Sequence, residues 1–159
     1  MQTLRFLMAG ALALAFAGTV SAAPARQDAA HEHQHEPTAG AATLHLNAGK
    51  KWETDAPLRQ AMGNIRQAMA ASLPGIHENR LSAKGYGQLA RKLEGEVGSI
   101  VAHCKLEPQA DRQLHLILSQ LLEGTQGMAS RTDSAKRQAG AVRVIGALEK
   151  YATYFDDGG

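Results

Sequence analysis

Four stretches between residues 56 and 155 repeat apolar residues every three or four positions, which is the period of a helix with one buried face. The first two stretches place apolar or weakly polar side chains at Leu58, Met62, Ile65, Met69 and Leu73, and at Tyr86, Leu89, Leu93, Val97, Ile100 and Cys104. The other two place them at Leu114, Ile117, Leu118 and Leu121, and at Ala141, Ile145, Leu148, Ala152 and Phe155. Four such helices with short connections predict an all-α, antiparallel up-down-up-down four-helix bundle.

Each predicted helix has its own start signal, and the first also has a stop signal. The starts are Thr54 or Asp55 with Pro57 in the first turn, then Ser82, Pro108, and Thr132 or Asp133. Pro74-Gly75 is expected to end the first helix. The residues before it predict a short extended segment at 44–46, a turn at 47–50, and a tryptophan, Trp52, laid over the bundle.

The first 22 residues are typical of a secretory signal peptide. A short positive region at 1–5 precedes an apolar run at 6–20, and small residues at Val20-Ser21-Ala22 offer a cleavage site. The apolar run is shorter than the ~20 residues that a membrane-spanning helix needs. We therefore expect cleavage near Ala22 and a soluble periplasmic protein, with a retained N-terminal anchor as the alternative.

Residues 23–42 contain no large apolar side chain and predict a disordered tail. Inside this tail, the tract 31–36 alternates His31, His33 and His35 with Glu32 and Glu36. Imidazole is a good ligand for Cu(II), Zn(II) and Ni(II), and the carboxylates could hydrogen-bond the ring nitrogens that do not bind metal. The tract predicts metal capture; the alternative is a solvated spacer. The folded part is expected to span 43–157.

A second candidate metal site follows from helix register. Met62 and His115 each lie about six or seven residues from the same end of the bundle, which puts both roughly 9–11 Å below that end. Cys104 lies a turn or two above them. A thioether, an imidazole and a thiol together are ligands that favour Cu(I). The alternative is that Met62 and Cys104 fill the core and that His115 is a hydrogen-bonded core histidine.

Two cofactor alternatives are weaker. Covalent haem is excluded because a Cys-x-x-Cys-His motif is absent from the sequence. Non-covalent haem held by Met62 and His115 is conceivable but not favoured, since those residues lie on helices that are usually diagonal in a bundle. No catalytic triad, phosphate loop or Glu-x-x-His pair occurs, so we expect no enzymatic activity.

The composition excludes several classes of fold and function. The formal net charge is +2, which gives no basic field for nucleic-acid binding. Aromatic residues make up 4% of the chain, which argues against a β-rich fold. With a single cysteine, the chain can form no internal disulfide.

Three blocks of the sequence resemble small exported helical proteins of Gram-negative bacteria, some of which are labelled DnrO-like. The blocks are Gly49 to Met62, Cys104-Lys105-Leu106-Glu107-Pro108-Gln109-Ala110-Asp111 through His115, and Ala147 to Asp157 with Tyr151, Tyr154 and Phe155. Where that family favours Gly, this chain has Ala61. The resemblance implies a helical fold and export, and it implies no particular activity.

Together these patterns predict a periplasmic bundle that binds or buffers a transition metal, with copper favoured. The metal would be recruited by His31, His33 and His35 and retained by Met62, Cys104 and His115. The alternative is an accessory bundle that binds a protein or a small apolar ligand without metal.

Overall fold

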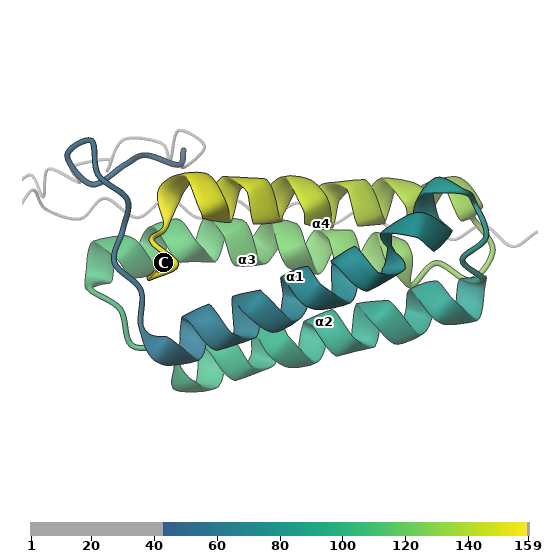
Figure 1. The fold of residues 1–159 in the computed structure, drawn as a ribbon, viewed down its shortest axis with the longest axis horizontal. Coiled ribbons are helices and arrows are strands. Elements are labelled where there is room, and N and C mark those ends of the chain that lie inside the picture. The colour runs from purple at the N-terminus through teal and green to yellow at the C-terminus, as the bar shows by residue number, and fades with distance from the viewer. Residues whose placement is uncertain (1–42, 159) are drawn as a thin grey trace, which may run out of the picture. The chain divides into compact units, whose positions relative to one another are not determined.

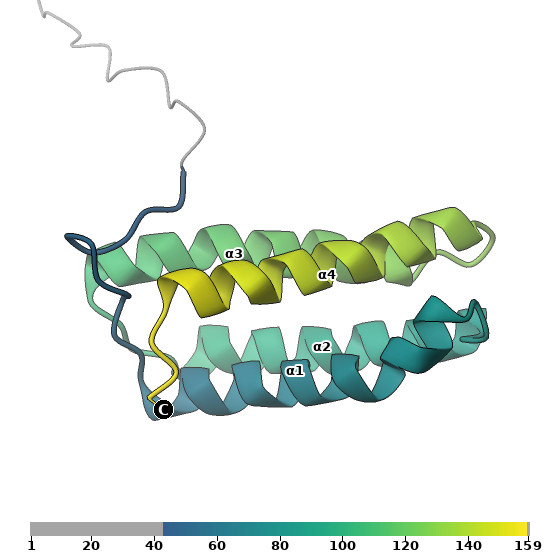
Figure 2. The same ribbon diagram turned by 45° about the horizontal axis from the view of Figure 1, so that its top comes forward.

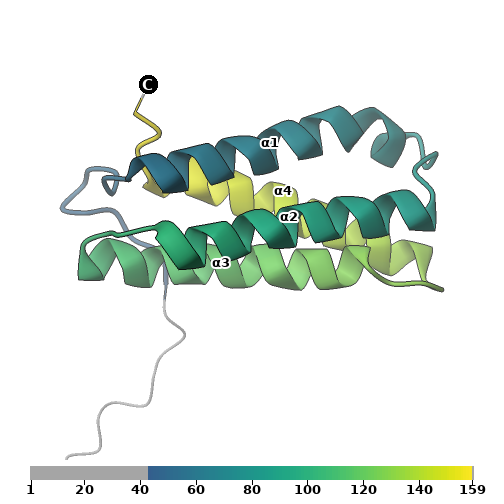
Figure 3. The ribbon, with the colours of Figure 1, turned by 90° about the horizontal axis from the view of Figure 1, so that it is seen from below.

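The computed structural model describes residues 43–158 and confirms the predicted all-α four-helix bundle. Its helices are α1 (Ala56–His77), α2 (Ala83–His103), α3 (Pro108–Met128) and α4 (Ser134–Tyr154). Figure 1 shows them antiparallel in chain order, and Figure 2 shows α1 lying beside α2 and α3 beside α4. The closest backbone approach is between α3 and α4, whereas α1 and α3 are diagonal and stay apart; Figure 3 gives the view from below.

The helix starts agree with the sequence prediction because each cap supplies an acceptor for a free amide at the first turn. The side chains of Asp55, Ser82 and Asp133 accept hydrogen bonds from Leu58, Gly85 and Lys136. Pro108 is the first residue of α3, where its missing N–H is harmless.

Trp52 is 4% exposed and lies over the end of the bundle, as the sequence predicted. Its Nε1 donates to the backbone oxygen of His45 at 2.7 Å, and the backbone N–H of His45 donates to Gln113 Oε1 at 2.9 Å. Gln113 is buried, so this chain of hydrogen bonds satisfies a polar group that the core would otherwise leave unpaired. The predicted turn at 47–50 is also present, closed by hydrogen bonds between Asn47 and Lys50.

The predicted end of the first helix was wrong. α1 continues through Pro74 to His77, because a proline in the last turn loses only its own amide bond. The amide of Glu78 donates to the Pro74 oxygen, and the amides of Arg80 and Leu81 donate to the Gly75 oxygen. Ile76 is buried beyond the proline, which gives the extra turn a packing role.

The predicted buried stripe of α4 was partly wrong. Ala152 is exposed and Ile145 is only half-buried, whereas Val144 and Tyr151 are fully buried. Two small residues, Gly140 and Ala141, let α4 approach α3 closely and turn this set of side chains inward. The buried face of α4 is therefore shifted by about one residue from the predicted buried face.

Candidate functional site

Cys104, one of the predicted site residues, lies at the end of the bundle where α1 begins, beside Asp55. Asp55 joins two chain segments there: its Oδ1 accepts from the Leu58 amide at 2.9 Å, and its Oδ2 accepts from the Lys105 amide at 2.6 Å. Burial alone would raise the pKa of this carboxyl, but the hydrogen bonds from Lys105 and Leu58 outweigh it and lower the pKa below its ordinary value. Asp55 therefore stays ionised and ties the start of α1 to the connection between α2 and α3.

Cys104 is half-buried at the residue that ends α2. Burial, followed by the charge and hydrogen bond of Asp55, raises the pKa of its thiol to about 12. Metal ions bind the thiolate form of cysteine. The Cys104 thiol is therefore protonated, and binding a metal ion through its sulfur would release that proton.

His115 lies on the outer surface of α3. Its side chain is 65% exposed, its Nδ1 lies 2.9 Å from the backbone oxygen of Asp111, and Asp111 Oδ2 is 3.5 Å away. A carbonyl can only accept, so in the neutral ring Nδ1 carries the proton and Nε2 keeps its lone pair. The prediction of a core position for His115 was wrong; it is a single surface imidazole.

Met62, in contrast to His115, is fully buried: its side chain is 0% exposed within the hydrophobic core. It belongs to α1, which is diagonal to the α3 helix that carries His115. The structure therefore does not bring Met62, Cys104 and His115 together around one ion, and it gives Met62 and His115 no shared space for a haem iron.

The tract containing His31, His33 and His35 lies outside the described residues. Within residues 43–158, no three His, Cys, Asp or Glu side chains are grouped so that they could hold a metal ion. His45, His77 and His103 are each exposed on separate parts of the bundle. The described part of the chain thus offers isolated imidazoles only.

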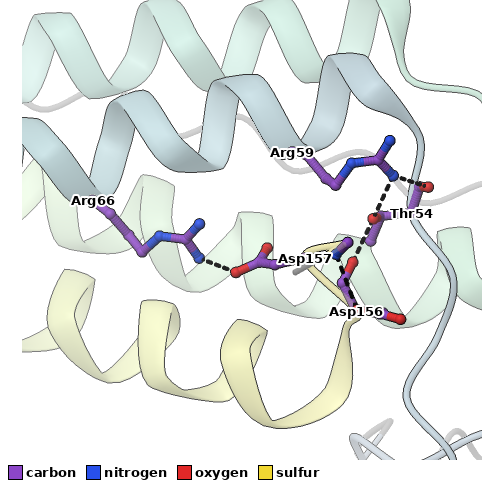
Figure 4. Close-up of polar contacts among 6 residues, drawn as sticks. Thr54, Arg59, Arg66, Asp156 and Asp157 are labelled. Atoms are coloured by element: carbon purple, nitrogen blue, oxygen red, sulfur yellow. Dashed lines mark hydrogen bonds and ion pairs between the residues drawn. The ribbon is translucent and has the colours of Figure 1, made fainter.

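A polar cluster that the sequence reasoning missed ties the C-terminal segment to α1 (Figure 4). Arg66 forms an ion pair with Asp157 at 2.5 Å. Arg59 Nη1 donates to the Thr54 backbone oxygen, and the Thr54 hydroxyl donates to the Asp156 backbone oxygen. Arg59 and Arg66 are seven residues apart and so share one face of α1, but nothing in the sequence shows that Asp156 and Asp157 fold back along this face.

Aromatic packing lies directly beneath this cluster. The rings of Tyr151 and Phe155 stack at 5.3 Å, and both residues are 0% exposed. Burial, with the nearby charge of Asp157, raises the pKa of the Tyr151 hydroxyl well above its ordinary value. The Tyr151 hydroxyl is buried without a hydrogen-bond partner among residues 43–158, and the Arg66 guanidinium lies over the Tyr151 ring, 6.0 Å from its centroid.

An open hollow of about 440 Å³ adjoins this end of the bundle, between residues 52–55 and 105–110. Its charged lining is net negative, with Glu53, Asp55 and Glu107 against the single Lys105. Two of these acids already act within the fold, since Asp55 and Glu107 cap the starts of α1 and α3.

Among helices α1 to α4, none combines the length and the apolar character that crossing a membrane requires.

No family model matches the chain, and neither the curated proteins nor the solved structures compared with it give a match.

Proposed function

We propose that this chain is a non-catalytic periplasmic protein that binds a transition-metal ion through His31, His33 and His35, with copper as the preferred metal. The observation that carries the proposal is the alternation of three imidazoles with two carboxylates inside six residues. The bundle serves as a stable carrier for this tract.

The chemistry of the tract favours copper among the divalent ions. Nitrogen and oxygen sites bind first-row metals in an order that peaks at Cu(II), which also accepts a planar set of imidazole ligands. Glu32 and Glu36 add negative charge close to the rings and can accept hydrogen bonds from ring nitrogens that do not bind metal. Because ordering a polar segment around an ion costs conformational entropy, the affinity is modest and suits buffering.

Export supports the same proposal. The apolar run at 6–20 with its small-residue cleavage site is a secretory signal, and the resemblance to exported DnrO-like proteins points to the same compartment. Met62, Cys104 and His115 have no metal-binding role in this proposal, because the first is enclosed in the core and the last lies on the surface.

The proposal is tested by equilibrium dialysis of the mature chain against Cu(II) and Zn(II). The variant His31→Ala/His33→Ala/His35→Ala removes the tract imidazoles. The variant His77→Ala/His103→Ala/His115→Ala removes an equal number from exposed positions on the bundle. We expect one bound copper per chain in the natural sequence and in the bundle variant, and none in the tract variant. Equal binding by both variants would refute the proposal.

A second candidate function is an accessory bundle that acts through protein contacts. One observation favours it: an open hollow of about 370 Å³ beside α4 is lined mainly by apolar side chains, among them Ala139, Val142 and Ile145.

A further inference from the structure

The segment 155–158 is held against α1 in the way that a protein holds an extended peptide. It leaves the end of α4 and runs to the start of α1, as Figure 2 shows. The Trp52 amide donates to the Tyr154 oxygen at 2.8 Å, and the Asp156 amide donates to the Trp52 oxygen at 2.9 Å, which is the pairing of two parallel strands. Backbone pairing of this kind fixes the register of a bound segment whatever its side chains are.

One aromatic side chain anchors the segment. Phe155 is 0% exposed, and its ring stacks on the Tyr151 ring with an angle of 7° between the two planes. A buried aromatic anchor commonly supplies most of the binding energy where one protein recognises another. An aromatic residue at this position is therefore the main requirement that the site places on its occupant.

Two arginines of α1 add requirements at the next positions. Figure 4 shows Arg66 reaching from α1 to the Asp157 carboxylate, and the two charged groups are 2.5 Å apart. A Cβ atom at Gly158 would lie 3.2 Å from the Arg59 side chain, and the φ of +72° at this glycine is one that other residues rarely adopt. The site thus accepts an aromatic residue, an acid two residues later, and then a glycine.

The chain's own segment does not satisfy every polar group of the site. Among residues 43–158, the Tyr151 hydroxyl and Asp157 Oδ1 are both buried and lack a hydrogen-bond partner. Unpaired buried polar atoms weaken a contact. A segment whose carboxylate accepts from both the Tyr151 hydroxyl and the Arg66 guanidinium would fit this site better than residues 155–158 do.

We propose that this site binds an acidic peptide segment of a partner protein and that residues 155–158 occupy it in the free chain. The ligand is an extended segment with an aromatic residue and, two residues later, an aspartate or glutamate. A second copy of the chain is not the partner, because Phe155 directly follows the last residue of α4 and no linker lets it reach another molecule. The chain's own segment is a tethered competitor, so its high local concentration weakens binding of the partner.

This site is separate from the tract 31–36, and neither the site nor the proposed metal binding depends on the other. The two proposals can therefore fail independently. The binding experiments below are run with a chelator present, so that metal bound by the tract cannot contribute to them.

Fluorescence anisotropy with a labelled synthetic peptide of residues 153–158 tests the proposal. The receptor is the full mature chain carrying Phe155→Ala and Asp157→Ala, which removes both side-chain contacts of the tethered segment. We expect saturable binding to this variant, at least a hundredfold tighter than binding to the natural chain. The peptide with Phe155→Ala should bind the variant at least a hundredfold more weakly, since it lacks the anchor.

Circular dichroism of the same samples covers the case in which the receptor variant is unfolded. The peptide should then restore the helical signal as it binds, because it supplies the missing core side chain. Absence of binding up to about 1 mM peptide, in a folded or an unfolded variant, overturns the proposal. Equal binding to the natural chain and to the variant also overturns it, since the peptide would then bind elsewhere.

Charge substitutions test the position of the ligand's acid. Arg66→Ala in the receptor variant should weaken peptide binding about two- to fivefold, since an ion pair that is partly exposed contributes little. Arg143→Ala is the matched control, because Arg143 forms an ion pair with Glu123 that involves neither α1 nor the segment. We expect no change in the control. Equal effects of the two substitutions, or equal binding of a scrambled peptide, would overturn the proposal.

Discussion

A Cβ atom added to Gly140 on α4 would lie 2.5 Å from the backbone oxygen of Gly124 on α3. The same atom would lie 2.5 Å from the Met128 amide nitrogen, so both neighbours are rigid backbone. The two helices therefore touch at a point where only glycine fits. This contact turns the α4 side chains inward and leaves Val142 on the outside.

Gly140→Ala should destabilise the bundle by about 1–3 kcal/mol, because α4 must move away from α3 to admit the methyl group. Gly146→Ala on the same helix is the control, since nothing lies within 4 Å of a Cβ at that position. Helix propensity predicts that the control stabilises the protein by up to about 1 kcal/mol. Urea unfolding followed by circular dichroism measures both. A neutral Gly140→Ala variant would contradict the close contact.

Phe155 should matter far more to the C-terminal segment than the Arg66–Asp157 ion pair. Phe155 is 0% exposed, and Phe→Ala in a core costs about 3–5 kcal/mol. The side chains of Arg66 and Asp157 are 39% and 35% exposed, and ion pairs of that kind contribute about 0–1 kcal/mol. Unfolding free energies of Phe155→Ala and Asp157→Ala compare the two effects. A larger loss in Asp157→Ala would show that the polar cluster anchors the segment.

Asp55 gives the stability a defined pH dependence. Burial would raise its folded-state pKa, but hydrogen bonds outweigh burial and lower this pKa below its ordinary value of 3.8. The ionised carboxylate therefore stabilises the fold above that pH, and the contribution is lost as the pH falls through the lowered folded value. Asp55→Ala should cost about 1 kcal/mol at pH 7 through loss of the helix cap. The difference between the natural chain and this variant should shrink below about pH 3.8, as urea titrations at several pH values would reveal. A constant difference would contradict the charge argument.

Cys104 should alkylate slowly in the folded protein. Burial and the Asp55 carboxylate raise its thiol pKa to about 12, from an ordinary value of 9.0. At pH 8 we expect iodoacetamide to react at least tenfold more slowly with the folded chain than with the chain in urea, because only the thiolate attacks. Asp55→Asn should speed the folded reaction more than Asp111→Asn, whose charge has the smaller effect. Equal folded and unfolded rates would contradict this.

Helix periodicity predicted the bundle and most of its core because burial on one face is a repeating property of the sequence. It failed where a tertiary contact decides the outcome. The close approach at Gly140 rotates α4 and buries Tyr151 in place of Ala152. α1 runs three residues past Pro74, and its last carbonyls, those of Pro74 and Gly75, accept amides from residues 78, 80 and 81.

The height of Met62 and His115 along the bundle was not enough to predict a shared site. Met62 and His115 can be assigned a height from residue counting, but a site also requires that both side chains point to the same space. His115 is one residue from Leu114, and that rotation of about 100° takes its ring to the surface. The Arg66–Asp157 pair could be anticipated from charge spacing only once the C-terminal segment was known to fold back along α1.

Electron paramagnetic resonance of the mature chain loaded with one equivalent of Cu(II) tests metal binding by the tract most directly, since it detects coordinated imidazole nitrogens. We expect coupling to imidazole that disappears in His31→Ala/His33→Ala/His35→Ala and persists in His77→Ala/His103→Ala/His115→Ala. An unchanged spectrum in the tract variant, or loss of the coupling in the bundle variant, would contradict the proposed function.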